Sequence, residues 1–393
     1  MPSRELLSLS LYSLLASNRG GLFIVFLPLY LVELKGASLP VALTILSLAY
    51  VPSSLIGPWV GRLSDRAGRR KPFLLLGEAS AFPLFLAIIW APGYVLAGGL
   101  FIAAELALAI GGPAYNAFVA DVTRTNERGE GYGLLNATSN AGAVVGFVLA
   151  GLVTYWYGLQ ALFPFVVAVM VGTLGVVLFL VPDIRIAASK VRRPLREMKN
   201  VVTFSFAVSI RAIGSGAVAG FYGYLAASLG ANSLEVSLVA IAGLVTGALT
   251  GIPLGRAIDR IGEIRGIWYG TVLTLASYGI FMWAPTWEAT VPAQAVRNGG
   301  LSFLSPGMNA WVTRMAPADQ RAEYLGVFSL INSTLWSVGP LIGAIAIELD
   351  GYFGLFAMAI GTTVISLVVM EFLYGEMGIR ARLQRRAAAS DEG

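Results

Sequence analysis

Five charged residues interrupt long apolar stretches of this 393-residue chain, and they are its first candidates for chemistry. They are Arg19, Glu78, Glu105, Arg211 and Arg297. An ionised side chain at the centre of a membrane-spanning helix costs about 2.5 to 3.5 kcal/mol on insertion scales, so it needs a function or a partner. The sequence therefore points to the binding of a charged solute, to proton movement, or to buried ion pairs.

The arginines favour binding of an anion. A planar guanidinium can donate two parallel hydrogen bonds to a carboxylate or a phosphate. Arg19 and Arg211 lie 192 positions apart, so two related parts of the chain could each supply one arginine to the same anion. The alternative is a structural role, in which Glu105, Glu78 or helix carbonyls neutralise each arginine. Other candidates for solute binding are Arg297, Asn18, Asn116, Asn298 and Asn309. The asparagine amides could instead bond across helices.

Glu105 is the main candidate for proton coupling, with Glu78 as a second. Burial in a low-dielectric cavity favours the neutral form of a carboxyl, so such a group can take up and release a proton as access changes. The chain has no histidine to compete for this role. The alternative is a structural salt bridge from Glu105 to Arg19 or Arg297.

A basic loop between two apolar stretches reads Gly61-x-x-x-Asp65-Arg66-x-Gly68-Arg69-Arg70-Lys71. Its glycines allow a tight turn, its aspartate can face the positive N-terminus of a neighbouring helix, and its arginines can reach an acid. We predict an inner gate here, and the alternative is that the basic residues only set topology. The gate would comprise Gly61, Asp65, Arg66, Gly68, Arg69, Arg70 and Asp121, with Asp259 and Arg260 in a second copy of the loop.

The elements that must position these residues are membrane-spanning helices. Hydrophobic residues make up 56% of the chain and charged residues only 12%, and apolar runs of about 20 residues recur along it. We predict an all-α membrane protein with twelve transmembrane helices. They lie at 6–32, 41–60, 72–90, 95–118, 131–156, 161–181, 201–229, 234–254, 266–283, 289–315, 324–347 and 354–374.

Internal repetition divides these helices into two halves. The loop that begins at Gly61 recurs at Gly255, and Pro113-Ala114-Tyr115-Asn116-Ala117 is answered by Pro306-Gly307-Met308-Asn309-Ala310. Repeats of the same order along the chain predict two parallel bundles related by an axis along the membrane normal. We expect six-helix bundles at 1–182 and 201–375, a cytoplasmic linker at 183–200 and a cytoplasmic tail at 376–393.

The distribution of basic residues sets the orientation. All but four of the 27 Lys and Arg residues fall at the N-terminus, in every second loop or in the tail. Cytoplasmic loops carry such an excess, so both termini are predicted to be cytoplasmic, in a multi-pass protein of the cell (inner or plasma) membrane. This bias explains the net charge of +5 without a nucleic-acid partner. The expected partners are a small-molecule solute and membrane lipids, and we expect a monomer.

The loop at Gly61 resembles the signature of the major facilitator superfamily, and the weaker copy at 255–265 stands where that family has its second. The resemblance covers nearly the whole chain and implies two pseudo-symmetric six-helix bundles. It also implies that helices 1, 4, 7 and 10 line a central cavity, and that Asp65, Arg69 and Asp121 hold the inner side closed. The arginine pair, Arg19 with Arg211, is similar to that of the superfamily's organophosphate/phosphate exchangers.

The predicted function is secondary active transport of a small solute by alternating access, either coupled to protons or by exchange. The solute would be an organic anion or an amphipathic compound. Alternatives of the same fold are a lipid flippase or scramblase and a multidrug efflux antiporter, although the arginine and glycines typical of helix 4 in drug antiporters appear here in helix 10, at Arg297, Gly299 and Gly300. A ligand sensor that does not transport is a further alternative.

Enzyme activity finds little support in the sequence. Neither cysteine nor histidine is present, which removes the commonest nucleophiles and metal ligands. The phosphate-binding loop of ATP-driven pumps is also missing. We therefore predict no enzyme activity, no metal and no cofactor.

Overall fold

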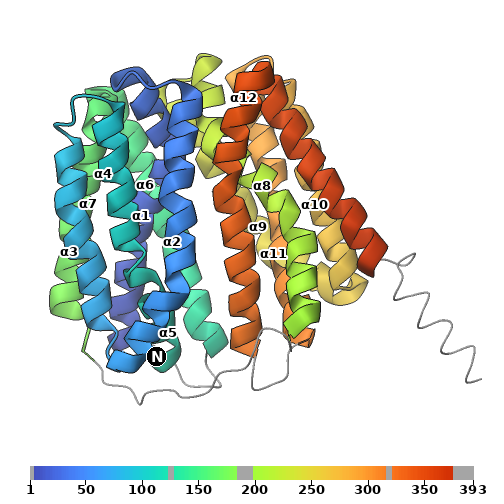
Figure 1. The fold of residues 1–393 in the computed structure, drawn as a ribbon, viewed down its shortest axis with the longest axis horizontal. Coiled ribbons are helices and arrows are strands. Elements are labelled where there is room, and N and C mark those ends of the chain that lie inside the picture. Colours follow the sequence, from blue (N-terminus) through green and yellow to red (C-terminus); the bar gives the residue numbers. More distant parts are fainter. Residues whose placement is uncertain (1–3, 123–127, 184–197, 316–320, 375–393) are drawn as a thin grey trace, which may run out of the picture. The chain divides into compact units, whose positions relative to one another are not determined.

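All the regular secondary structure is helical in the residues that the computed structural model describes, namely 4–122, 128–183, 198–315 and 321–374 (Figure 1). The first helices, with their short π and 3-10 turns, are α1 (Arg4–Leu29), η1 (Tyr30–Leu34), α2 (Leu39–Ala67), α3 (Lys71–Ile88), α4 (Tyr94–Leu108), α5 (Gly111–Val122), α6 (Arg128–Tyr157), η2 (Leu159–Ala161), α7 (Leu162–Gly175) and η3 (Val176–Leu180). The remaining helices are α8 (Lys199–Ser228), α9 (Ser233–Ile261), α10 (Glu263–Met282), η5 (Trp287–Ala289), α11 (Thr290–Met315) and α12 (Arg321–Tyr374).

Nine stretches of the described residues are long and apolar enough to cross a membrane. One of them, Tyr324–Tyr374, has 51 residues, about 77 Å of helix against a hydrocarbon core of about 30 Å. The helix is broken inside this stretch, because Gly351 has a φ of 58° that only glycine adopts readily. This break lies between the two spans predicted at 324–347 and 354–374. The total of twelve spans stays a prediction.

The chain divides into two compact units, which we describe separately. The first contains Met1–Arg192 and Ala219–Ile241, and the second contains Arg193–Val218 and Ala242–Gly393. The helices α8 and α9 therefore contribute to both units. The division of the chain into bundles at 1–182 and 201–375 stays a prediction.

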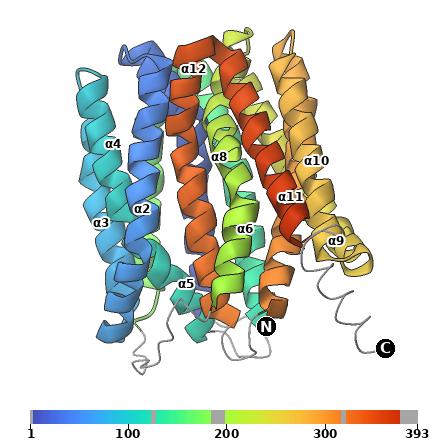
Figure 2. The ribbon, with the colours of Figure 1, turned by 45° about the vertical axis from the view of Figure 1, so that its right-hand side comes forward.

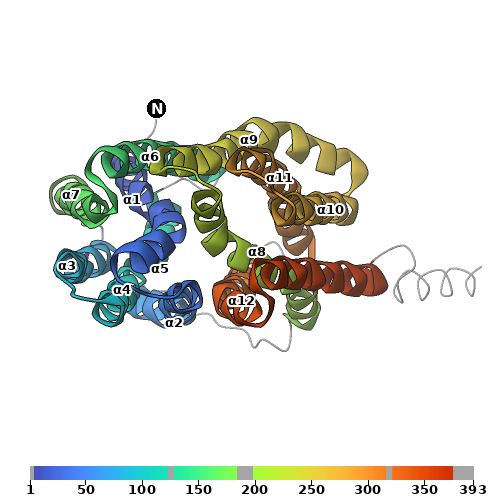
Figure 3. The same ribbon diagram turned by 90° about the horizontal axis from the view of Figure 1, so that it is seen from above.

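In the first unit, α4 packs beside α2 and α3 (Figure 2), and α1 lies next to α6 and α7 (Figure 3). The stretch Arg4–Leu34 is 69% buried, about twice the value of its neighbours α2 and α3. One half of α1 packs against an aromatic cluster, in which the Phe23 ring centroid lies 5.0 Å from that of Phe85 and 5.1 Å from that of Phe101. A largely buried helix of this unit thus carries Arg19.

Glycines bring α6 close to α1. A Cβ atom at Gly142 would lie 2.9 Å from the Cα of Leu14, and one at Gly146 would lie 2.7 Å from the Cα of Asn18. Real Cβ atoms essentially never come so close, so only glycine fits at either position. Close packing of α6 on α1 therefore accounts for the glycine at both positions.

The second unit uses the same device between α12 and α8. A Cβ atom at Gly339 would lie 2.7 Å from the backbone nitrogen of Ala217, and one at Gly343 would lie 2.9 Å from the Cβ of Ala217. A core of stacked aromatic rings lies at one end of this unit, with the Phe204 and Trp311 centroids 3.7 Å apart. The helices that carry Arg211 and Arg297, α8 and α11, are joined by this core.

Candidate functional site

Arg19 is paired with Glu78 inside the first unit. Arg19 Nη1 donates to Glu78 Oε2 at 2.7 Å, and Arg19 Nη2 donates to Glu78 Oε1. The two residues are 5% and 1% exposed. Because both guanidinium nitrogens face both carboxylate oxygens, this is a bidentate ion pair, the strongest geometry for the two groups.

Two hydroxyls complete the surroundings of this carboxylate. Tyr12 OH donates to Glu78 Oε1 at 2.9 Å, and Thr173 Oγ1 lies 3.1 Å from Glu78 Oε2. Tyr12 lies two helical turns before Arg19 on α1, so the two side chains share one face. Helices α1, α3 and α7 are thus joined by a buried network in which both oxygens of the Glu78 carboxylate accept hydrogen bonds. The geometry favours the structural alternative for Arg19, with Glu78 as its counter-ion.

Glu105 has a different environment on α4. No hydrogen bond or ion pair joins its carboxylate to another side chain in the described ranges, although its charge acts on Arg19 and on Tyr50. The side chain is partly buried. Of the two acids predicted for proton coupling, Glu105 is therefore the one whose carboxylate is available to a proton or a ligand.

Arg211, on α8, has no such counter-ion. It is 4% exposed, and its Nη2 lies 3.3 Å from the sulfur of Met308 on α11. Its Nε has no hydrogen-bond partner among the described residues. A thioether is a weak acceptor, so this contact cannot replace the hydration that a buried guanidinium loses.

Arg297, on α11, contacts α8 one turn away from Arg211. Its Nη2 donates to the carbonyl of Ser215 at 3.0 Å and to the Ser215 hydroxyl at 3.2 Å, while its Nε finds no partner in the described part of the chain. Ser215 follows Arg211 by one helical turn, about 6 Å along α8. The two guanidiniums are close enough to repel each other electrostatically.

Two further buried polar atoms of the second unit lack a hydrogen-bond partner among the described residues, and one of them belongs to Tyr278 of α10, which interacts electrostatically with Arg211. These atoms are the Tyr278 hydroxyl and the Gln294 side-chain oxygen. The ion pairs found in the described ranges join Arg19 to Glu78, Arg69 to Asp183 and Arg314 to Glu263. None of these acids reaches Arg211 or Arg297. The second unit thus holds two buried cations that described carboxylates leave unneutralised.

The predicted asparagines are less distinctive. Asn18 donates to the carbonyl of Leu14 at 2.9 Å, and Asn298 donates to that of Gln294 at 3.0 Å. Each amide thus bonds its own helix one turn back, and Asn309 also has an interaction partner. The side chain of Asn116 lies outside the part that the structure describes. None of these contacts indicates a ligand.

The predicted inner gate is described only in part. The positions Gly61, Asp65, Asp121 and Asp259 lie outside the described side chains. Around the loop, the backbone N–H of Gly68 donates to the carbonyl of Ser64 at 3.1 Å, with Gly68 at a φ of 62°. Arg69 pairs with Asp183, Arg70 donates to the Ser64 hydroxyl at 2.9 Å, and Lys71 donates to the carbonyl of Leu178 at 2.9 Å. Arg66 and Arg260 are exposed.

Sequence reasoning missed the residues that complete these sites. Tyr12 and Thr173 were not predicted as partners of Glu78, nor were Ser215 and Tyr278 as neighbours of the two arginines. For Tyr12 a signal exists, because a spacing of seven places it on the same helix face as Arg19. Ser215 likewise lies one turn after Arg211 on α8. Thr173 and Tyr278 come from helices distant in sequence, and hydroxyl side chains are common in such helices.

Comparison with known proteins gives matches over nearly the whole chain. A model of the Major Facilitator Superfamily matches residues 9–203 and again 204–390. The multidrug resistance protein MdtG of Proteus mirabilis is 26% identical, over 88% of this chain and 90% of its own. The nucleoside transporter NupG has a similar fold, with a TM-score of 0.76 at 13% identity over 93% of this chain and 97% of its own. The human organic anion transporter MFSD10 (TETRAN) gives a TM-score of 0.68 at 15% identity, over 93% and 99%.

Proposed function

Because the chain belongs to the Major Facilitator Superfamily, a family of membrane transporters rather than enzymes, we propose that it carries a small organic anion by alternating access. It is a multi-pass protein of the cell membrane. Substrate class and coupling are the parts of this function that the family alone leaves open. Arg211 and Arg297 are the residues that we assign to the anion.

One observation carries the proposal: two arginines, each at most 5% exposed, have no carboxylate partner among the described residues. A buried guanidinium without a counter-charge is strongly destabilised. A carboxylate or phosphate ester that enters between α8 and α11 supplies the missing charge and can accept hydrogen bonds from both free Nε groups. The similar fold of an organic anion transporter supports this substrate class.

A screen for ligands that stabilise the purified protein tests this substrate class. We expect carboxylates and phosphate esters to raise the melting temperature, because a ligand at 100 times its Kd adds about 2.7 kcal/mol to the stability of the folded state. Cationic drugs and neutral sugars should leave the melting temperature unchanged. The response to the anion should disappear in Arg211→Gln. If cationic drugs alone stabilise the protein, the unpaired Glu105 becomes the binding residue and the anion assignment fails.

Glu105 is the residue to which we assign proton coupling. In proteoliposomes, Glu105→Gln should still exchange anion for anion, but its net uptake should no longer respond to a pH gradient, because the neutral amide cannot load a proton. Glu288→Gln, at an exposed position in the turn Trp287–Ala289, is the control and should keep the response. If net uptake by the wild type does not depend on the pH gradient, proton coupling through Glu105 is refuted.

A further inference from the structure

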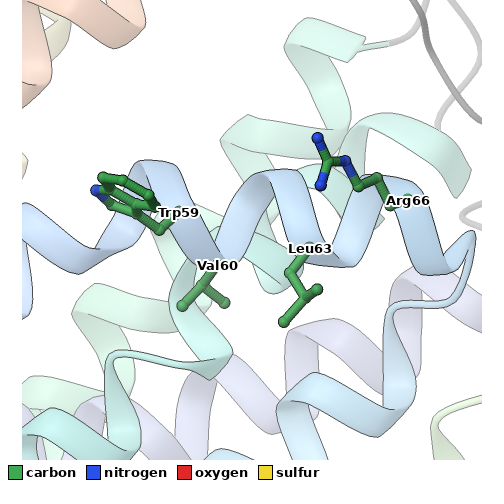
Figure 4. A pocket seen from close by; sticks show the side chains of 4 residues that line it. All are labelled: Trp59, Val60, Leu63 and Arg66. Carbon is green, nitrogen blue, oxygen red and sulfur yellow. The ribbon is translucent and has the colours of Figure 1, made fainter.

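A groove on α2 lies next to the basic loop. It has a volume of about 390 Å³ and is lined by Trp59, Val60, Leu63 and Arg66 (Figure 4). At 100° per residue, Trp59, Leu63 and Arg66 fall within about 60° of one another around the helix. The Trp59 and Leu63 side chains are 70% and 58% exposed. The groove is therefore an apolar strip that ends in a cation.

The depth of this strip matches the boundary between acyl chains and headgroups. The apolar run of α2 predicted from the sequence ends at Val60, next to Trp59, at the level where tryptophan is enriched in membrane proteins. Arg66 lies about 10 Å farther along the helix, within the polar layer that holds lipid phosphates. An arginine there can bind a phosphate while the tryptophan and leucine contact the upper acyl chain.

Arg66 is the loop cation that remains available. Its three basic successors are engaged: Arg69 with Asp183, Arg70 with Ser64 and Lys71 with the carbonyl of Leu178. No hydrogen bond or ion pair joins the Arg66 guanidinium to another residue in the described ranges. The groove thus combines an unneutralised charge with exposed apolar surface.

The internal repeat shows that the apolar part is particular to α2. Arg66 corresponds to Arg260, but the positions of Trp59 and Leu63 are taken by Pro253 and Ala257 in the second copy. An arginine that only sets topology or closes a gate would be needed in both copies of the loop, and both copies have one. Neither of these roles requires Trp59 or Leu63, which are present in the first copy alone, so these two residues need another explanation.

We propose that this groove binds one anionic phospholipid, with its phosphate on Arg66 and its acyl chain along Leu63 and Trp59. The negative headgroup complements Arg66 and the local positive charge of the loop, and each arginine near an anionic membrane surface contributes about 1 kcal/mol. A zwitterionic lipid of the same chain length has no net charge to offer. The site is separate from Arg211 and Arg297 and does not depend on the transported solute.

Native mass spectrometry of the purified full chain tests the site. The probes are phosphatidylglycerol and phosphatidylcholine with identical acyl chains, titrated into wild type, Arg66→Gln and the matched control Arg260→Gln. We expect the wild type to retain one phosphatidylglycerol that Arg66→Gln binds about fivefold more weakly, the factor that corresponds to one surface arginine. Arg260→Gln should bind it as the wild type does. Equal retention by Arg66→Gln, or equal binding of phosphatidylcholine by the wild type, would overturn the proposal.

A second measurement locates the acyl chain. Phosphatidylglycerol brominated near its headgroup should quench tryptophan fluorescence in wild type more than in Trp59→Phe, and the difference should vanish in Arg66→Gln. Unchanged far-ultraviolet circular dichroism in each variant will show that the fold is retained. Quenching that does not depend on Trp59 would place the lipid elsewhere and refute the site.

Discussion

Replacing Glu78 with glutamine will destabilise the folded protein by about 3 to 5 kcal/mol, because Arg19 is then left as a buried charge without its counter-ion. The amide can accept one hydrogen bond from the guanidinium but cannot neutralise it. Thermal unfolding of the purified protein, followed by circular dichroism, measures the effect as a lower melting temperature. Glu105→Gln is the matched control, since that carboxylate has no ion-pair partner in the described part of the chain and its neutralisation should cost nothing.

A triple variant separates charge from packing in the same site. Buried ion pairs can often be replaced by apolar side chains of similar volume without loss of stability. Tyr12→Phe, Arg19→Met and Glu78→Leu together should therefore recover most of the stability that Glu78→Gln loses. If Glu78→Gln melts at the wild-type temperature, the pair does not neutralise Arg19 in the membrane, and the structural role that we assign to it is wrong.

Replacing Arg211 with glutamine should have the opposite effect on stability and should weaken the binding of the anion. Removal of a buried cation that lacks a counter-ion relieves about 1 to 3 kcal/mol, so the unliganded variant should melt at or above the wild-type temperature. Binding of an anionic substrate should weaken by about 2 kcal/mol or more, which is about 30-fold or more in Kd. Arg297→Gln should behave alike.

The conservative change Arg211→Lys refines this expectation. Lysine keeps the charge but not the planar fork, so it should retain part of the affinity and lose the preference for planar carboxylates over other anions. A loss of stability in Arg211→Gln as large as that in Glu78→Gln would show that Arg211 has a structural partner. In that case Arg211 would have a structural role like that of Arg19, and the anion would need another site.

Much of the fold could be predicted because the constraints of the membrane are strong. Apolar runs of spanning length, the repeated loops at Gly61 and Gly255 and the packing glycines Gly142 and Gly146 all lie in the sequence itself, and the helices and their close contacts agree with them. Helix breaks are harder to foresee. The span expected at 95–118 consists of α4 and α5. The two residues between these helices are Ala109 and Ile110, neither of which is a proline or a glycine that would have indicated a break.

The environments of the arginines could not be predicted from the repeat. Arg19 and Arg211 occupy corresponding places, and their symmetry suggests a shared role. The two halves differ in what surrounds these residues: Glu78, 59 positions away on α3, neutralises Arg19, whereas Met308 on α11 contacts Arg211. Sequence periodicity specifies which face of a helix is apolar, but not which side chain of another helix meets a given arginine.

The most direct test of this account is equilibrium binding of the anion that best stabilises the wild type, measured by isothermal titration calorimetry on two variants. The account predicts that the triple variant Tyr12→Phe, Arg19→Met, Glu78→Leu binds the anion with a Kd close to that of the wild type, and that Arg211→Gln binds it at least about 30-fold more weakly. The reverse result, with binding lost in the triple variant and kept in Arg211→Gln, would contradict it.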